Sequence, residues 1–180
     1  MAVEEAPLEQ TENGLVARGG GWFVLNARDS QWWHADGRGA FCDFEAGTTF
    51  EQVGMGIYVL QPGDPMSMYH WENDQEDFLV LSGEALLIVE GDERPLVPWD
   101  FAHFPPHAAH TIVGAGSGPC VIVAVGAREH QGGEDWGAYP VDDAALRHGV
   151  GVEEETNRGA IAYANGPKRS PTRYDGWLGE

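Results

Sequence analysis

The chain has 180 residues, of which 42% are hydrophobic and 11% aromatic, values typical of one folded domain with extensions. Its 10 basic and 29 acidic residues give a net charge of −19, which disfavours nucleic acid and anionic lipid as partners because both require neutralising Lys and Arg. The first 13 residues are acidic and no apolar run approaches the length of a membrane span. We therefore expect a cytoplasmic protein without a signal or transit peptide.

Short strand-like segments dominate the chain after a polar N-terminal arm at residues 1–20, of which the first 13 are predicted to be disordered or loosely held. They are separated by turn residues, and no helical period appears before residue 140. The predicted strands lie at residues 21–25, 32–34, 39–44, 55–60, 66–71, 77–81, 84–89, 94–97, 101–104, 110–113 and 119–125. Many short strands at nearly even spacing predict an all-β sandwich or barrel over residues 21–128.

The sequence changes character after Gly126. A polar loop is followed by a predicted short helix at about residues 142–148, with Asp142 or Asp143 as its N-cap. The rest of the extension at residues 129–180 is polar with scattered aromatic residues. We expect it to pack back on the barrel or across a dimer. The two cysteines, Cys42 and Cys120, stand beside apolar residues and are predicted to be buried free thiols.

The densest group of chemically active side chains lies at residues 70–76. Side chains alternate between the two faces of a strand, so His70 and Glu72 point the same way, and Glu76 opens the next strand after a polar turn. His110, which follows a Pro-Pro turn, is the best candidate for a fourth ligand. Imidazole and carboxylate together suit Fe, Mn, Ni, Co or Zn. The alternative is an acidic surface loop beside two hydrogen-bonded histidines.

Two stretches resemble the conserved motifs of the cupin superfamily. The first motif has Gly before His-x-His, then Glu, then Gly; here Gly63 precedes His70, Glu72 stands at the second His, and Glu76 and Gly83 follow. In the second motif Pro105 and His110 fit, whereas His107 replaces a Gly and Gly114 replaces an Asn. Both motifs lie within residues 52–126, which is less than half of the chain. The chain looks most like cupins with a His-x-Glu variant of the first motif.

The resemblance implies a double-stranded β-helix, or jelly roll, with N- and C-terminal extensions, and commonly a homodimer. It implies one divalent metal on His70, Glu72, Glu76 and His110, with Glu72 favouring a harder ion; a metal-free cupin is the alternative. Cupins include oxygenases, isomerases and ligand-binding proteins. We therefore expect a metal-dependent oxygenase or isomerase acting on a small organic molecule, or else a non-catalytic protein that binds a small ligand or a sugar.

Five further residues are candidates for the substrate pocket because they lie on strands near the predicted ligands: Tyr58, Met66, Met68, Phe78 and His103. Met66 and Met68 share the face of His70, and Tyr58 lies on a strand that could reach the mouth of the barrel. The methionines and Phe78 fit barrel filling equally well. His103 lies in the middle of a strand, where a hydrogen-bonded histidine of the barrel is the alternative to a pocket residue.

Overall fold

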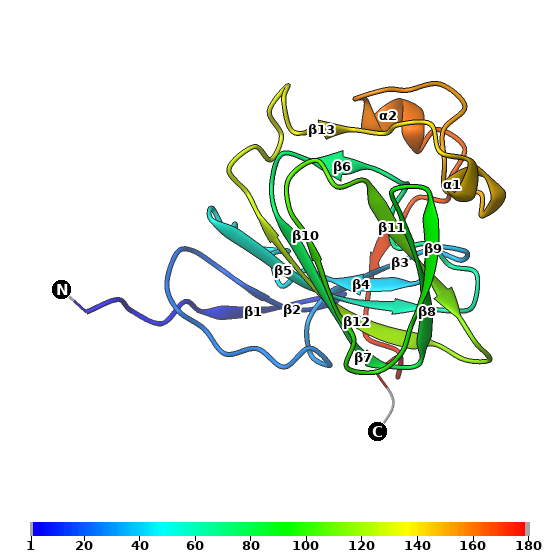
Figure 1. The fold of residues 1–180 in the computed structure, drawn as a ribbon. Coiled ribbons are helices and arrows are strands. Elements are labelled where there is room, and N and C mark those ends of the chain that lie inside the picture. The colour runs from blue at the N-terminus through cyan, green and yellow to red at the C-terminus, as the bar shows by residue number, and fades with distance from the viewer. Residues whose placement is uncertain (1, 179–180) are drawn as a thin grey trace.

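The computed structural model describes residues 2–178, and a seven-stranded antiparallel sheet is its largest element (Figure 1). Its strands in spatial order are β10 (Phe101–Phe104), β7 (Glu76–Ser82), β12 (Cys120–Ala127), β5 (Val53–Leu60), β4 (Ala40–Cys42), β3 (Trp32–His34) and β14 (Ser170–Thr172). A three-stranded sheet faces it and consists of β11 (His110–Ala115), β8 (Glu84–Val89) and β9 (Asp92–Leu96).

The core lies between these two sheets. Both contribute inward-facing side chains that alternate with outward-facing ones along each strand, as packed sheets require: Phe78, Val80, Leu87, Ile112 and Ile122. All five are buried. Cys42 and Cys120 are buried free thiols, and burial raises the pKa of Cys120 to about 11. The predicted all-β cupin-type barrel is thus confirmed.

The N-terminal segment is more ordered than predicted. It forms a hairpin of β1 (Leu8–Thr11) and β2 (Gly14–Ala17). A Cβ atom at Gly14 would lie 2.6 Å from the carbonyl oxygen of Ser30, so only glycine fits there. The strand predicted at residues 21–25 is absent. Trp22 forms only an isolated bridge with Glu5, and the side chains of Trp22 and Val24 are exposed.

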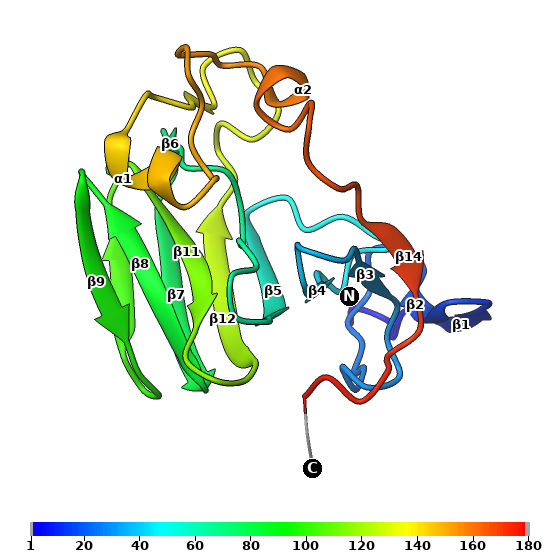
Figure 2. The same cartoon turned by 90° about the vertical axis from the view of Figure 1, so that its right-hand side faces the viewer.

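The C-terminal extension packs back on its own barrel. It contains β13 (Gly137–Ala138), α1 (Asp143–Arg147), α2 (Gly159–Ala162) and β14. Asp142 caps α1 by accepting a hydrogen bond of 2.8 Å from the backbone N–H of Ala145, as predicted for the short helix. Figure 2 shows β14 beside β3, with which it pairs. No helix within residues 2–178 is long and apolar enough to cross a membrane.

Candidate metal centre

Backbone pairing brings the two predicted histidine ligands together. His70 and His110 lie opposite each other in an antiparallel bridge, with each backbone N–H donating to the carbonyl of the other at 3.2 and 2.8 Å. His70 directly precedes the short strand β6 (Trp71–Glu72), and Glu76 begins β7 after a three-residue turn. The four residues therefore come from two short stretches that the barrel holds side by side.

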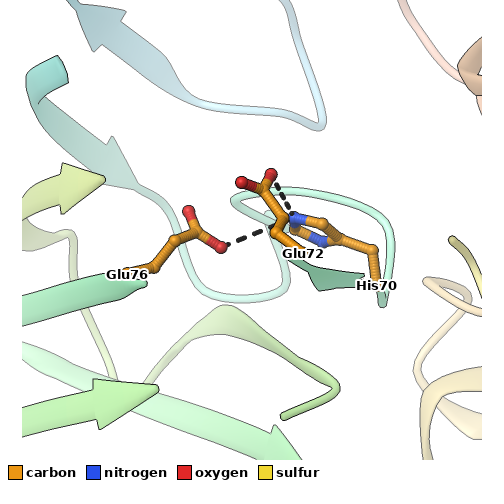
Figure 3. Close-up of side chains that lie close together, drawn as sticks. All are labelled: His70, Glu72 and Glu76. Atoms are coloured by element: carbon orange, nitrogen blue, oxygen red, sulfur yellow. Dashed lines mark hydrogen bonds and ion pairs between the residues drawn. The ribbon is translucent and has the colours of Figure 1, made fainter. Parts of the chain in front are cut away.

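The side chains of these residues converge on one point. The Nε2 atom of His70 lies 3.2 Å from Oε1 of Glu72 and 3.7 Å from Oε2 of Glu76 (Figure 3). The Nε2 atom of His110 lies 3.3 Å from the same Glu76 oxygen. One ligand atom each from His70, Glu72 and Glu76 lies within 4.8 Å of the others, so this group could hold an ion.

Hydrogen bonds to the backbone fix the orientation of both imidazole rings. Nδ1 of His70 lies 2.8 Å from the carbonyl oxygen of Met68, and Nδ1 of His110 lies 2.9 Å from that of Ala108. A carbonyl can only accept, so both Nδ1 atoms carry the proton and each Nε2 faces the site. The Phe104 ring stacks on His110 with centroids 3.8 Å apart and holds it further. Metal-binding histidines are commonly oriented in this way.

Two buried polar atoms at the site lack a hydrogen-bond partner among the described residues. They are Oε2 of Glu76 and Nε2 of His110, which are close but not aligned as a hydrogen bond. Buried polar atoms are almost always paired, so such atoms require an explanation. With Nδ1 protonated, a neutral His110 offers only a lone pair toward the carboxylate, and a cation between the two atoms would satisfy both. The residues therefore fit a bound metal ion.

Electrostatics at the site also favour positive charge. Burial alone would lower the pKa of His70, but the hydrogen bond that His70 donates to Glu72 and the charges of Glu76 and Glu72 outweigh burial and raise this pKa. Burial alone would raise the pKa of Glu76, but His110 and His70 outweigh it and lower that pKa. Glu76 is thus ready to act as an anionic ligand at neutral pH.

A cavity of about 200 Å³ opens beside the four side chains. Three of the predicted pocket residues line it: Tyr58, Met66 and Phe78. The other two do not. The pocket assignment of His103 is wrong, because its side chain lies on the outer face of the sheet and pairs with Oδ1 of Asp77 at 2.7 Å. Met68 also lies outside this cavity, because residues 66–70 bend and its side chain lines a neighbouring groove.

Sequence reasoning missed three aromatic residues that line the cavity. Trp136 and Tyr139 flank β13, and Tyr163 directly follows α2. The rings of Trp136 and Tyr139 lie 6.1 and 5.8 Å from the ring of His70. The C-terminal extension carries no motif, and the available signal was the occurrence of large aromatic residues within a polar, glycine-rich stretch.

The fold is a cupin-type barrel with a His/Glu group as a candidate metal centre, and comparison with known proteins agrees with the fold. Residues 56–126 match the family model of the cupin domain. This match identifies a cupin domain at residues 56–126 of the chain. No curated protein matches the chain.

Several solved structures are similar to this chain. A putative sugar phosphate isomerase from Acidithiobacillus ferrooxidans is 30% identical over 50% of this chain, with a TM-score of 0.47, and the chain spans 59% of its length. A cupin 2 domain-containing protein from Halorhodospira halophila is 19% identical with a TM-score of 0.50, covering 63% and 77% of the two chains. The polyketide cyclase RemF from Streptomyces resistomycificus is 14% identical with a TM-score of 0.51, covering 60% and 80%. The similarity to the last two structures shows that they share a fold with this chain.

Proposed function

We propose that this protein binds one divalent transition metal through His70, Glu72, Glu76 and His110. The observation that carries the proposal is the convergence of two Nε2 atoms, both oriented by backbone carbonyls, on two carboxylates, with buried atoms of Glu76 and His110 left unpaired. Two imidazoles and two carboxylates suit Fe, Mn, Ni, Co or Zn, and the second carboxylate favours the harder ions of this group.

We further propose that the site is catalytic and acts on a small organic molecule, with oxygenase or isomerase chemistry. The metal, when bound, supplies a Lewis acid or a redox centre. Among the protein groups, Glu72 has the more exposed carboxylate, with 29% of its side chain accessible against 19% for Glu76. Glu72 is therefore the ligand whose carboxylate can also exchange a proton with substrate, whereas Glu76 and the two histidines only hold the metal. The competing function is non-catalytic binding of a small ligand or a sugar in the same cavity.

Metal analysis tests the proposed site. The protein is purified without chelator or affinity metal, and bound metals are measured by plasma mass spectrometry beside the His70→Ala/His110→Ala double variant. We expect near-stoichiometric Fe, Mn, Ni, Co or Zn in the wild type and at least tenfold less in the variant. The control is His103→Ala/His148→Ala, which removes two histidines from outside the site. A wild type that stays empty after reconstitution would contradict the proposal.

The identity of the metal then directs the activity test. Iron leads to oxygen-consumption assays with small organic substrates, and Zn or Mn leads to isomerase assays. A metal whose coordination is complete without an exchangeable water would favour the binding protein over the enzyme, because catalysis needs an open position.

We also propose that the protein forms a homodimer through the outer face of the large sheet. One row across four strands is entirely apolar: Phe101, Leu79, Val123 and Ile57. Phe101 is 65% exposed, and Trp99 in the preceding turn is 74% exposed. An exposed apolar face lowers the solubility of a protein, even of a strongly acidic one. Contact with a second copy of the chain would bury this face, which is a physical reason for its presence.

Light scattering after size exclusion tests the dimer. We expect about twice the chain mass of 19.6 kDa for the wild type and the chain mass itself for Phe101→Glu. Val24→Glu is the matched control, because Val24 is 79% exposed and lies outside the large sheet. A monomeric wild type, or a Phe101→Glu variant that remains dimeric, would contradict this interface.

A further inference from the structure

One part of the wall of the cavity beside the candidate metal centre is aromatic. Four of its lining residues are Tyr58, Trp136, Tyr139 and Tyr163, which come from β5 and from the C-terminal extension. The rings of Trp136 and Tyr139 lie 5.2 Å apart, and those of Tyr139 and Tyr163 lie 5.9 Å apart at nearly a right angle. Since a cavity of roughly 150 Å³ accepts benzene, the 200 Å³ here is enough for one ring with few substituents.

Charge around the cavity is unfavourable to anions. No Lys or Arg is among its lining residues in the part of the chain that the structure describes, whereas Glu72 and Glu76 are. A neighbouring cavity of about 250 Å³ shares these two carboxylates and contains Arg128. Both guanidinium Nη atoms of Arg128 bond to Glu45 carboxylate oxygens, at 2.6 and 2.5 Å, so this cation is already neutralised.

Two arginines lie behind the aromatic wall, and neither lines the cavity. The guanidinium of Arg38 lies 4.6 Å from the centre of the Tyr163 ring. That of Arg169 lies 5.6 Å from the Tyr58 ring, and its Nη2 donates to the carbonyls of Arg38 at 2.6 Å and Met66 at 3.4 Å. A phosphate or carboxylate in the cavity would therefore lack the charged partners that such groups need.

Two hydroxyl groups in the wall already take part in hydrogen bonds within the protein. Thr111 donates to the carbonyl of Ser67 at 2.8 Å, and the Tyr163 hydroxyl accepts from the backbone N–H of Met68 at 3.1 Å. A sugar ring would bring several hydroxyl groups into this space. Each one left without a partner costs about 1–3 kcal/mol.

From size, charge and hydrogen-bonding capacity together, we infer that the cavity takes a small uncharged molecule with a flat ring and few polar groups, and that it excludes phosphate esters. The inference deepens the proposed function and rests on it in one respect: a divalent ion cancels the two glutamate charges, leaving a neutral site. The flat ring packs against Trp136 and Tyr139, and its polar group faces the metal ligands.

Ligand-observed NMR with phenol, glucose and glucose 6-phosphate as probes tests the inference, using full-length protein in metal-free and zinc-loaded forms. We expect phenol to bind both forms and glucose 6-phosphate to bind neither. Trp136→Ala should weaken phenol about tenfold through loss of ring packing. Ala124→Leu should also weaken phenol binding, because Ala124 lines the cavity and the larger leucine side chain would fill part of the cavity. Val24→Ala, which changes an exposed residue away from the cavity and from the proposed dimer face, is the control.

The outcomes separate the two proposals. Glucose 6-phosphate or glucose binding that is lost in the Ala124→Leu variant would overturn the inference while zinc loading still supports the metal site. Absence of phenol binding to either form would also overturn the inference. Phenol binding to a protein that cannot be loaded with any metal would support the inference about the cavity and overturn the proposed metal site.

Discussion

His107 occupies a backbone conformation that suits glycine. Its φ angle is +73°, in the left-handed region, at the position where the second cupin motif has a Gly. The backbone N–H of His107 donates to the carbonyl of Glu72 at 2.8 Å, and its ring contacts Trp71 with centroids 5.1 Å apart. The strained residue thus holds the segment that carries a candidate ligand.

Replacing His107 separates the backbone strain from the ring contact. His107→Ala loses the contact with Trp71 but keeps the strain, whereas His107→Gly loses both. We expect the Gly variant to be more stable than the Ala variant by about 1 kcal/mol in urea unfolding, because left-handed φ costs a residue with a Cβ atom about 1–2 kcal/mol. Equal stability of the two variants would show that the turn relaxes in solution.

At the scale of elements, the loop between β12 and β13 is attached to the turn between β6 and β7. His130 Nδ1 lies 2.9 Å from Oδ1 of Asp74, and the backbone N–H of Asn73 donates to the carbonyl of Trp136 at 2.8 Å. The hydrogen bond to Asp74 raises the pKa of His130. Burial would raise the pKa of Asp74, but His130 outweighs burial and lowers it.

These shifts predict how the pair stabilises the fold at different pH. Because the pKa of His130 is raised, its contribution to the free energy of unfolding is complete below about pH 6.5. This contribution is lost as pH rises through the pKa of His130 in the folded protein. Because the pKa of Asp74 is lowered, its contribution to the free energy of unfolding is complete above about pH 3.9. This contribution is lost as pH falls through the pKa of Asp74 in the folded protein. His130→Ala should therefore destabilise the protein more at pH 5.5 than at pH 8.5 in urea unfolding. Equal losses at both pH values would contradict an ion pair.

The elements also show where prediction from the sequence succeeds. Residues 84–89 and 120–125 have apolar runs that the sheets bury on both faces, so β8 and most of β12 were predictable. Residues 66–71 were predicted as a strand, but Met68 and Tyr69 donate to the Tyr163 hydroxyl and the Val150 carbonyl. These partners lie about 80–95 residues away, and no local pattern indicates them.

The candidate metal ligands could be predicted because strand alternation and the cupin motifs indicate these residues. The aromatic residues of the cavity wall could not be predicted. Trp136 and Tyr163 reach the site through pairing of β13 with β6 and through the packing of α2, which are long-range contacts. The prediction for His103 was wrong because alternation along a strand separates two faces but does not indicate which face points into the barrel. The pairing of β10 with β7 puts His103 on the outer face beside Asp77.

At the scale of the whole molecule, the net charge of −19 acts against folding, because like charges are closer together in the folded chain than in the unfolded one. Salt screens this repulsion over a Debye length of about 10 Å at 0.1 M. We expect the melting temperature to rise when NaCl increases from about 10 mM to about 300 mM. A fall would mean that surface ion pairs such as Arg18–Glu9, which salt weakens, outweigh the repulsion.

The origin of the cavity walls in the C-terminal extension has a consequence for biosynthesis. A ribosome makes residues 70–110, which carry the four candidate ligands, before it makes Trp136, Tyr139 and Tyr163. Apart from β6, which pairs with β13, the barrel strands from β5 to β12 find partners among residues made earlier than the extension. His70, Glu76 and His110 can therefore come together while the aromatic side of the cavity is still missing. If the proposed metal site is correct, an ion would reach the nascent chain from that open side, and docking of the extension would then enclose it.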